Sequence, residues 1–178
     1  MAYASTKVKA ISTILSSEMQ ALGGDIRAVI ITDFEKTSAT TLVEGVMDDE
    51  AGGAVAAFRQ AVQCANVDLL NPILMTGSTV LVDDDLAEEF LAAANNWIEE
   101  RSLAITLVDE IRGDYHEIVG KGKDWIPRYY SLMITEFFQL GITKCLIGTR
   151  GLLGEGWDAS RINVLIDLTT VTTSMSIN

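Results

Sequence analysis

The sequence predicts a single three-layer α/β domain with a mainly parallel sheet. Short runs of β-branched and aliphatic residues alternate along the chain with amphipathic segments, and strands joined through helices must cross over and pair in parallel. Of the 178 residues, 48% are hydrophobic, which suffices for one buried core. We find no internal repeat and no Pro-rich or Ser-rich linker that would divide residues 1–178 into two domains.

The first predicted elements are a helix and a buried strand. After Ser5, apolar residues recur at the spacing of one helical face until Gly23-Gly24 ends the pattern. Residues 27–33 form a β-branched run that ends in Asp33. Such a run is typical of a strand that is buried on both faces of a parallel sheet.

The middle of the chain continues the alternation. Its predicted elements are, in order, a polar loop at residues 35–50, a helix at 51–65, a short strand at 73–78 and a helix whose buried stripe runs from Leu86 to Ile98. Val80-Leu81-Val82 either extends the strand or lies beside it. Asp83-Asp84-Asp85 is interpreted as the cap of the following helix.

The last third predicts one further helix and several strands. The strands are expected at residues 103–108, 115–119, 143–147 and 162–168, and the helix from Pro127 to Gly141. Because the ligand crevice of an α/β sheet lies at the carboxyl ends of its strands, the polar residues at those ends are candidates for a site. They are Asp33, Thr76, Thr149 and Thr169.

Composition narrows the class of protein. The net charge of −12 argues against a basic domain that coats nucleic acid, yet six of the 13 basic residues lie in residues 121–161, where an anionic partner is expected to bind. No apolar run reaches the roughly 18 residues of a membrane span, and no secretory signal is recognised. Cys64 and Cys145 are expected to be buried free thiols, so we expect a cytoplasmic protein.

The densest signal is a glycine-rich stretch that directly follows a predicted strand. Residues 146–158 read Leu-Ile-Gly-Thr-Arg-Gly-Leu-Leu-Gly-Glu-Gly-Trp-Asp. Glycines let backbone amides approach a ligand closely, and a hydroxyl, a guanidinium and two carboxylates lie among them. Trp157 either flanks a base or ribose or anchors the loop in the core. Residues 125–130 likewise either stack on bases or begin the apolar face of a helix.

This stretch resembles motif V of the superfamily 2 (DEAD/DEAH-like) helicases, in the Glu-Gly-Trp-Asp variant. Gly148-Thr149-Arg150 and Glu155-Gly156-Trp157-Asp158 carry the resemblance. Residues 163–169 are similar to the strand that leads to motif VI, and residues 27–34 to the motif IV strand. The resemblance implies a RecA-like fold of the P-loop NTPase type and identifies the chain as the carboxyl-proximal domain of such a motor.

The same resemblance implies roles for individual residues. In that family motif V touches both the nucleotide and the nucleic-acid backbone. Asp158 would accept a hydrogen bond from the ATP ribose, Gly156 would leave room for the nucleotide, and Glu155 belongs to the same nucleotide-binding group. Thr149 and Arg150 would meet the backbone of DNA or RNA, as would Thr76, Gly77 and Ser78 at another strand end, where short donors hold phosphates without reading bases.

Two motifs of a complete motor are not found in the sequence. Residues 120–124, Gly-Lys-Gly-Lys-Asp, lack the upstream glycine and the terminal hydroxyl of a Walker A motif. Phosphoryl transfer needs Mg²⁺ and positioned cations, so we expect no ATP hydrolysis by this chain alone and no catalytic or metal-binding residue in it. ATP and Mg²⁺ would act in an intact protein whose amino-proximal RecA-like domain is the partner, and motif VI would begin just after Asn178.

Two other functions remain open at this point. A self-contained receiver-like signalling or binding module would use Asp33 as a carboxylate at a strand end. A Rossmann-type cofactor binder is less well matched, because Gly-x-Gly-x-x-Gly does not follow the first predicted strand. His116 is the single histidine and is expected to lie at the surface or in a hairpin, which argues against a histidine-rich metal site.

Overall fold

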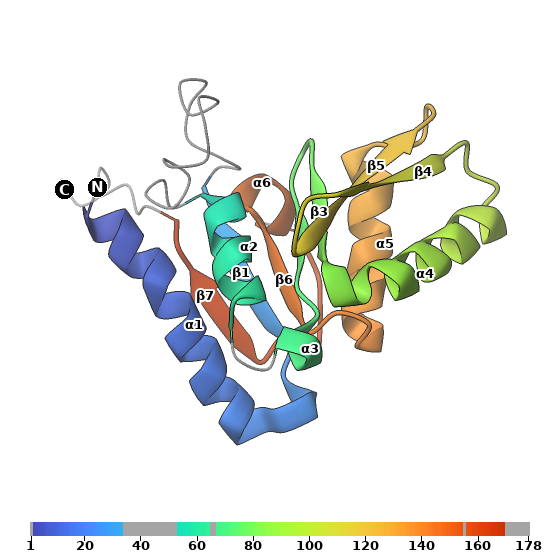
Figure 1. The fold of residues 1–178 in the computed structure, drawn as a ribbon. Helices are drawn as coiled ribbons and strands as arrows, with labels where there is room; N and C mark the ends of the chain where they lie inside the picture. Colours follow the sequence, from blue (N-terminus) through green and yellow to red (C-terminus); the bar gives the residue numbers. More distant parts are fainter. Residues whose placement is uncertain (1, 34–52, 65–66, 155, 170–178) are drawn as a thin grey trace.

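A seven-stranded sheet lies between two layers of helices in the computed structural model (Figure 1), which describes residues 2–33, 53–64, 67–154 and 156–169. The predicted loop at residues 35–50 falls outside these ranges. The strands follow one another across the sheet in the order β4-β5-β3-β2-β6-β1-β7. The expected three-layer α/β architecture is therefore observed.

The parallel half of the sheet consists of four strands. They are β1 (Ala28–Thr32), β2 (Ile73–Met75), β6 (Cys145–Thr149) and β7 (Val164–Asp167). Strand β6 pairs in parallel with β1 and β2, and β1 pairs in parallel with β7. The sequence placed each of these strands to within a few residues, because each is a continuous apolar run between clear breaks.

The other half of the sheet is antiparallel, which corrects the expectation of a mainly parallel sheet. It contains β3 (Val80–Asp83), β4 (Thr106–Ile111) and β5 (Tyr115–Lys121). Of the six pairings between described strands, those of β2 with β3, β3 with β5 and β4 with β5 are antiparallel. The turns that join β2 to β3 and β4 to β5 are too short for a crossover, and such turns produce antiparallel neighbours.

Helices cover both faces of the sheet. Their bounds are α1 (Ala2–Leu22), α2 (Ala54–Val62), α3 (Val67–Leu70), α4 (Ala87–Glu100), α5 (Pro127–Leu140) and α6 (Arg150–Leu153), with 3₁₀ turns η1 (Gly23–Asp25) and η4 (Asp84–Leu86). One buried cluster joins α1 and α2 to the sheet, and a second joins α4 and α5 to its other face. None of the helices in the described ranges combines the length and hydrophobicity needed to cross a membrane.

Helix α5 begins and ends where its sequence signals predict. Pro127 occupies its first turn, where the missing N–H costs no hydrogen bond. Gly141 ends the helix with a φ of 83°, and its N–H donates to the carbonyls of Phe137 and Phe138. This left-handed cap is favourable for glycine and strained for other residues.

The interpretation of Asp83-Asp84-Asp85 as a helix cap is confirmed in position, since Asp83 is the N-cap residue of η4 and Asp84 and Asp85 lie in its first turn, but it is wrong about the capping hydrogen bond. Neither η4 nor α4 has a side-chain hydrogen bond at its N-cap. Asp83 instead ends β3 with only 3% of its surface exposed, and one of its carboxylate oxygens is buried without a hydrogen-bond partner. Burial, reinforced by the nearby charge of Asp85, raises the pKa of Asp83 to about 6. Pairing at the end of β3 therefore outweighed the local capping preference.

His116 lies in the β4–β5 hairpin, which is one of the two positions expected for it, and it is buried there rather than exposed at the surface. The residue is 8% exposed on β5, and both ring nitrogens contact carboxylates. Nδ1 lies 2.6 Å from Asp109 on β4, and Nε2 lies 2.6 Å from Asp84 in η4. Burial alone would lower the pKa of His116, but the hydrogen bonds to Asp84 and Asp109 raise it above its ordinary value.

We expect this contact to stabilise the fold in a pH-dependent way. Because the pKa of His116 is raised on folding, its stabilisation is complete below the unfolded pKa of about 6.5 and is lost as the pH rises through the higher folded value. Urea unfolding of the native chain and of His116→Gln should therefore differ most at about pH 6 and progressively less toward about pH 9. A difference that grows with pH would contradict this assignment.

Candidate nucleotide and nucleic-acid interface

The carboxyl ends of the four parallel strands meet at one edge of the sheet. Strand pairing places Thr32 opposite Thr149, and Ile31 opposite both Gly148 and Asp167. Met75, just before Thr76, is also opposite Gly148. The polar strand ends that the sequence selected are therefore brought together by the sheet. Because this edge lies at a crossover between parallel strands, it is the ordinary position of a ligand crevice.

The loop that joins β6 to β7 leaves from this edge. Helix α6 begins immediately after β6, and Gly154 follows its last residue. A Cβ atom on Gly154 would lie well inside van der Waals contact with the carbonyl oxygen of Arg150. Only glycine fits at this position without moving the backbone, because the opposing atom belongs to the main chain. The glycine spacing noted in the sequence thus has a steric origin at Gly154.

Trp157 anchors the same loop to the core. Its indole Nε1 donates a hydrogen bond to Thr135 Oγ1 of α5 at 2.9 Å. Its ring centroid lies 6.5 Å from that of Phe138 in a tilted arrangement. The sequence left two roles open for Trp157, and the structure shows the one in which its side chain anchors the loop in the core.

The anchored loop leaves the predicted nucleotide-binding residues accessible. Gly156 has a φ of 87° and is exposed, and the side chain of Asp158 is exposed as well. Glu155 lies outside the described residues. The half-buried Trp157 between Gly156 and Asp158 therefore fixes the loop while its neighbours face solvent, so that a ligand or a second domain can reach them.

Three charged side chains meet beside the loop. Arg150 Nη2 lies 3.6 Å from Asp33 Oδ1, which places the guanidinium at the end of β1. The Asp167 carboxylate accepts hydrogen bonds from the Thr169 hydroxyl and backbone N–H. These two bonds, with the positive charge of Arg150, lower the pKa of Asp167. A phosphate bound at this edge would compete with the Asp33 carboxylate for the Arg150 guanidinium, so the ion pair between Arg150 and Asp33 could be exchanged for one with a ligand.

The strand end at Thr76 is a tight turn. The Thr76 side chain is 1% exposed, and its hydroxyl accepts the N–H groups of Ser78 and Thr79 at 3.3 and 3.0 Å. The Tyr130 hydroxyl donates to the Thr76 carbonyl. Thr76 therefore shapes the turn, and Gly77 and Ser78 are the exposed members of the predicted phosphate-binding group.

Two residues of α5 support the site in roles that the sequence did not predict. Tyr130 holds the turn after β2, and Thr135 holds Trp157. Both lie on the buried face of an amphipathic helix, where the helical period predicts core positions and gives no hint of a distant polar partner. Trp125 packs against Tyr130 with ring centroids 4.9 Å apart, which agrees with the packing role considered for residues 125–130.

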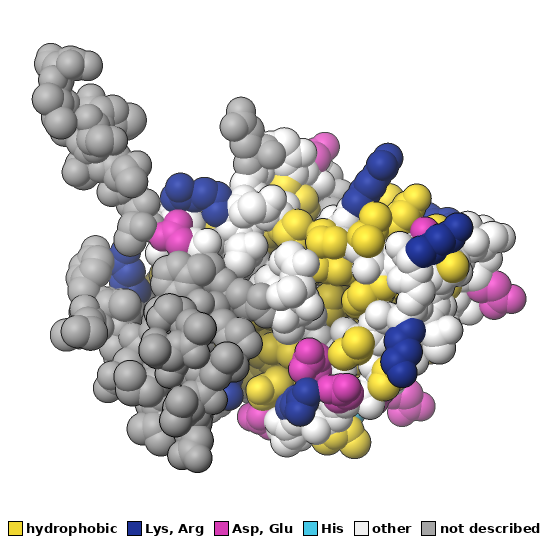
Figure 2. Space-filling model, turned by 90° about the horizontal axis from the view of Figure 1, so that it is seen from above, with side chains coloured by type: hydrophobic (Ala, Val, Ile, Leu, Met, Phe, Trp, Pro, Cys, Tyr) yellow, Lys and Arg dark blue, Asp and Glu magenta, His cyan; other side chains and the backbone are white. Residues whose placement is uncertain are grey.

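The strand-end face combines uncovered hydrophobic surface with charges of both signs. Figure 2 looks down on the end of the molecule at which α6 lies in Figure 1, and hydrophobic side chains are visible across its middle with basic and acidic side chains around them. Lys121, Lys123 and Arg128 are exposed on the chain that leads from β5 into α5. These cations belong to the stretch expected to meet an anionic partner.

In the described ranges, no group of three or more His, Cys, Asp or Glu side chains is placed so that it could hold a metal ion. Both described cysteines are buried free thiols, as the sequence predicts.

Comparisons of the chain with protein-family models, with curated proteins and with solved structures found no match.

Proposed function

We propose that the chain is the carboxyl-proximal RecA-like domain of a superfamily 2 DNA or RNA helicase or translocase. The observation that carries this proposal is the loop after β6. It resembles motif V in sequence, it leaves the carboxyl edge of a parallel sheet, and Trp157 fixes it with Gly156 and Asp158 exposed. A loop that is anchored and open in this way is suited to one side of a pocket between two domains.

The nucleotide would contact the distal part of this loop. The Asp158 carboxylate is exposed and can accept a hydrogen bond from a ribose hydroxyl. Gly156 adds no side chain between the loop and the nucleotide. In this proposal Glu155, between Gly154 and Gly156, belongs to the same contact. ATP with Mg²⁺ would be bound mainly by a partner RecA-like domain that carries a Walker A motif.

The nucleic-acid backbone would contact the proximal part of the loop. Thr149 stands at the N-cap of α6 with no side-chain capping hydrogen bond, so its hydroxyl is not used in a cap. Arg150, Gly77 and Ser78 supply further donors at the same edge. Hydroxyl and amide donors form hydrogen bonds with phosphates whatever the base sequence, and a motor that moves along a strand requires contacts of this kind. Closure over ATP and reopening after hydrolysis would shift these donors along the track.

The proposal is tested with variants that remove either the nucleotide contact or the nucleic-acid contact, in a protein that holds both RecA-like domains. Asp158→Ala should lower ATP turnover roughly tenfold or more without nucleic acid, because it removes a hydrogen bond to the nucleotide. Thr149→Ala should leave that basal turnover in place and reduce its stimulation by a single-stranded oligonucleotide. Steady-state ATPase assays with and without the oligonucleotide measure both effects.

Thr13→Ala is the control, because Thr13 is an exposed residue of α1 and has no role in the proposed contacts. It should behave like the native protein in both assays. If Asp158→Ala and Thr149→Ala were equally without effect, the assignment of the loop to an ATP-driven motor would be wrong.

A further inference from the structure

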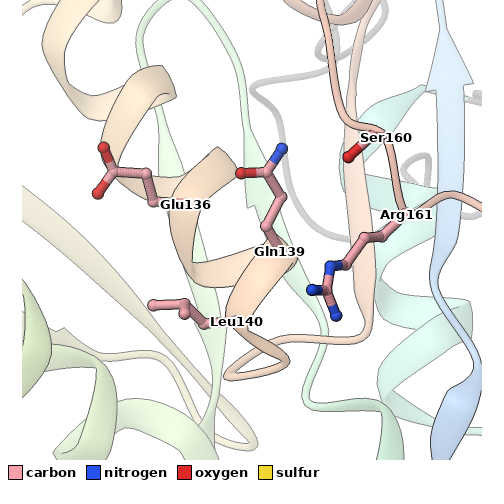
Figure 3. Close-up of a pocket in the computed structure, with 5 residues that line it drawn as sticks. All are labelled: Glu136, Gln139, Leu140, Ser160 and Arg161. Atoms are coloured by element: carbon pink, nitrogen blue, oxygen red, sulfur yellow. The ribbon is translucent and has the colours of Figure 1, made fainter.

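A pair of neighbouring cavities lies at the opposite edge of the sheet from the α6 loop, where α5 ends and where β1 and β7 begin. The larger, of about 420 Å³, is lined by Glu136, Gln139 and Leu140 of α5 and by Ser160 and Arg161 of the segment before β7 (Figure 3). The smaller, of about 260 Å³, is lined by Asp25, Arg27 and Arg161. Arg161 belongs to both, so the two spaces adjoin at its side chain.

Asn163 holds the backbone around the smaller cavity in place. Its Oδ1 accepts the Arg27 N–H at 2.8 Å, and its Nδ2 donates to the Asp25 carbonyl at 2.8 Å. The Asn163 N–H also donates to the Arg27 carbonyl. Two segments more than 130 residues apart in sequence are thus tied together, and the residues that line the cavity are held before any ligand arrives.

Backbone carbonyls hold the guanidinium of Arg27. Its Nη1 donates to the carbonyls of Gly24 and Ile26 at 3.2 and 2.8 Å. Its Nε is buried and has no hydrogen-bond partner. No carboxylate of the described residues forms an ion pair with it. A guanidinium held only by carbonyls keeps its full charge and is suited to an oxyanion.

Arg161 adds a second guanidinium to the same space. It is exposed, and the structure records no ion pair for it within the described ranges. Asp25 offsets one of the two positive charges, which leaves the smaller cavity with a formal charge of +1 in a chain of net charge −12. Glu136 in the larger cavity is already engaged, because its carboxylate accepts Trp97 Nε1 at 2.8 Å and Arg101 Nη2 at 3.4 Å.

We propose that the Arg27–Arg161 cavity binds an oxyanion, namely the phosphate or carboxylate group of a small ligand. The adjoining space would take the rest of that ligand, against the Gln139 amide, the Ser160 hydroxyl and the Leu140 side chain. The combined cavities are of the size of small-molecule sites. This proposal is independent of the motor function, because it concerns other residues at the opposite edge of the sheet.

The test is a titration of the ¹⁵N-labelled chain with two probes, inorganic pyrophosphate and citrate, followed by amide NMR shifts and by calorimetry. Saturable shifts at Gly141 and Asn163, beside the cavity, are expected with one or both probes. A response to pyrophosphate alone identifies a phosphate ligand, and a response to citrate alone a carboxylate. Shifts at Gly156 would report the α6 loop separately, so the failure of one proposal is distinguishable from that of the other.

The decisive variant is Arg161→Gln, because Arg161 is exposed and its replacement leaves the hydrogen bonds of Arg27 and Asn163 intact. It should weaken binding roughly tenfold through the loss of a charge-assisted hydrogen bond. Lys9→Gln removes an exposed positive charge of α1 and should leave binding unchanged. The absence of saturable shifts at Gly141 and Asn163 up to about 10 mM of either probe, or unchanged affinity in Arg161→Gln, would overturn the proposal.

Discussion

Replacing Gly154 by alanine is expected to destabilise the fold by about 2 kcal/mol, the usual cost of forcing one carbon into a filled space. The new Cβ would overlap the carbonyl oxygen of Arg150, and a backbone oxygen cannot move aside as the end of a flexible side chain can. The chain between β6 and Trp157 would have to rearrange. Urea unfolding at constant pH measures the loss as a lower midpoint with an unchanged slope.

Gly151→Ala is the matched control three residues earlier. Nothing lies within 4 Å of a Cβ built on Gly151, and its φ is not positive. Alanine is also the better helix former, so we expect this variant to be neutral or more stable by up to about 1 kcal/mol. Equal stability of Gly154→Ala and Gly151→Ala would show that the close approach of Gly154 to Arg150 is not what the loop requires.

Trp157→Ala is expected to cost about 2 to 3 kcal/mol, at or just below the lower end of the range for truncating a buried Trp or Phe, because Trp157 is only half-buried. The variant loses both the ring packing on Phe138 and the hydrogen bond to Thr135. The loop that holds Gly156 and Asp158 would lose its attachment to α5. We therefore expect faster proteolytic cleavage within residues 154–160 in addition to the lower unfolding midpoint.

Trp157→Phe separates the two contributions of the anchor. It keeps an aromatic ring but removes the indole N–H, and the Thr135 hydroxyl still donates to the Ser131 carbonyl at 2.6 Å. The expected loss is about 1 kcal/mol, the net contribution of one hydrogen bond. A Trp157→Ala variant as stable as Trp157→Phe would mean that the ring does not pack as described.

Elements with a strong local signal could be placed from the sequence. Residues 27–33 and 143–147 each contain an uninterrupted apolar run, at 28–31 and 145–147, and correspond to β1 and β6. Helix α5 has both its proline start and its glycine stop. The strand predicted at residues 103–108 is found at Thr106–Ile111. This exposed edge strand is largely fixed by pairing with β5, which the local pattern does not encode.

The candidate site was only partly visible in the sequence. The glycine-rich loop was found because its residue types are unusual and contiguous. The roles of Thr135 and Tyr130 were missed because their partners, Trp157 and Thr76, lie 22 and 54 residues away. The burial of His116 was missed for the same reason, since its two carboxylate partners come from other elements.

The sequence by itself determined most of the strands and helices, and the glycine-rich stretch that follows the Cys145–Thr149 strand, because hydrophobic period and glycine content act over a few neighbouring residues. Only the tertiary structure decided the order of the strands, the antiparallel half of the sheet and the partners of Trp157, Arg27 and His116. Those features depend on contacts between distant segments, whose free energy is set by burial and pairing in the assembled core.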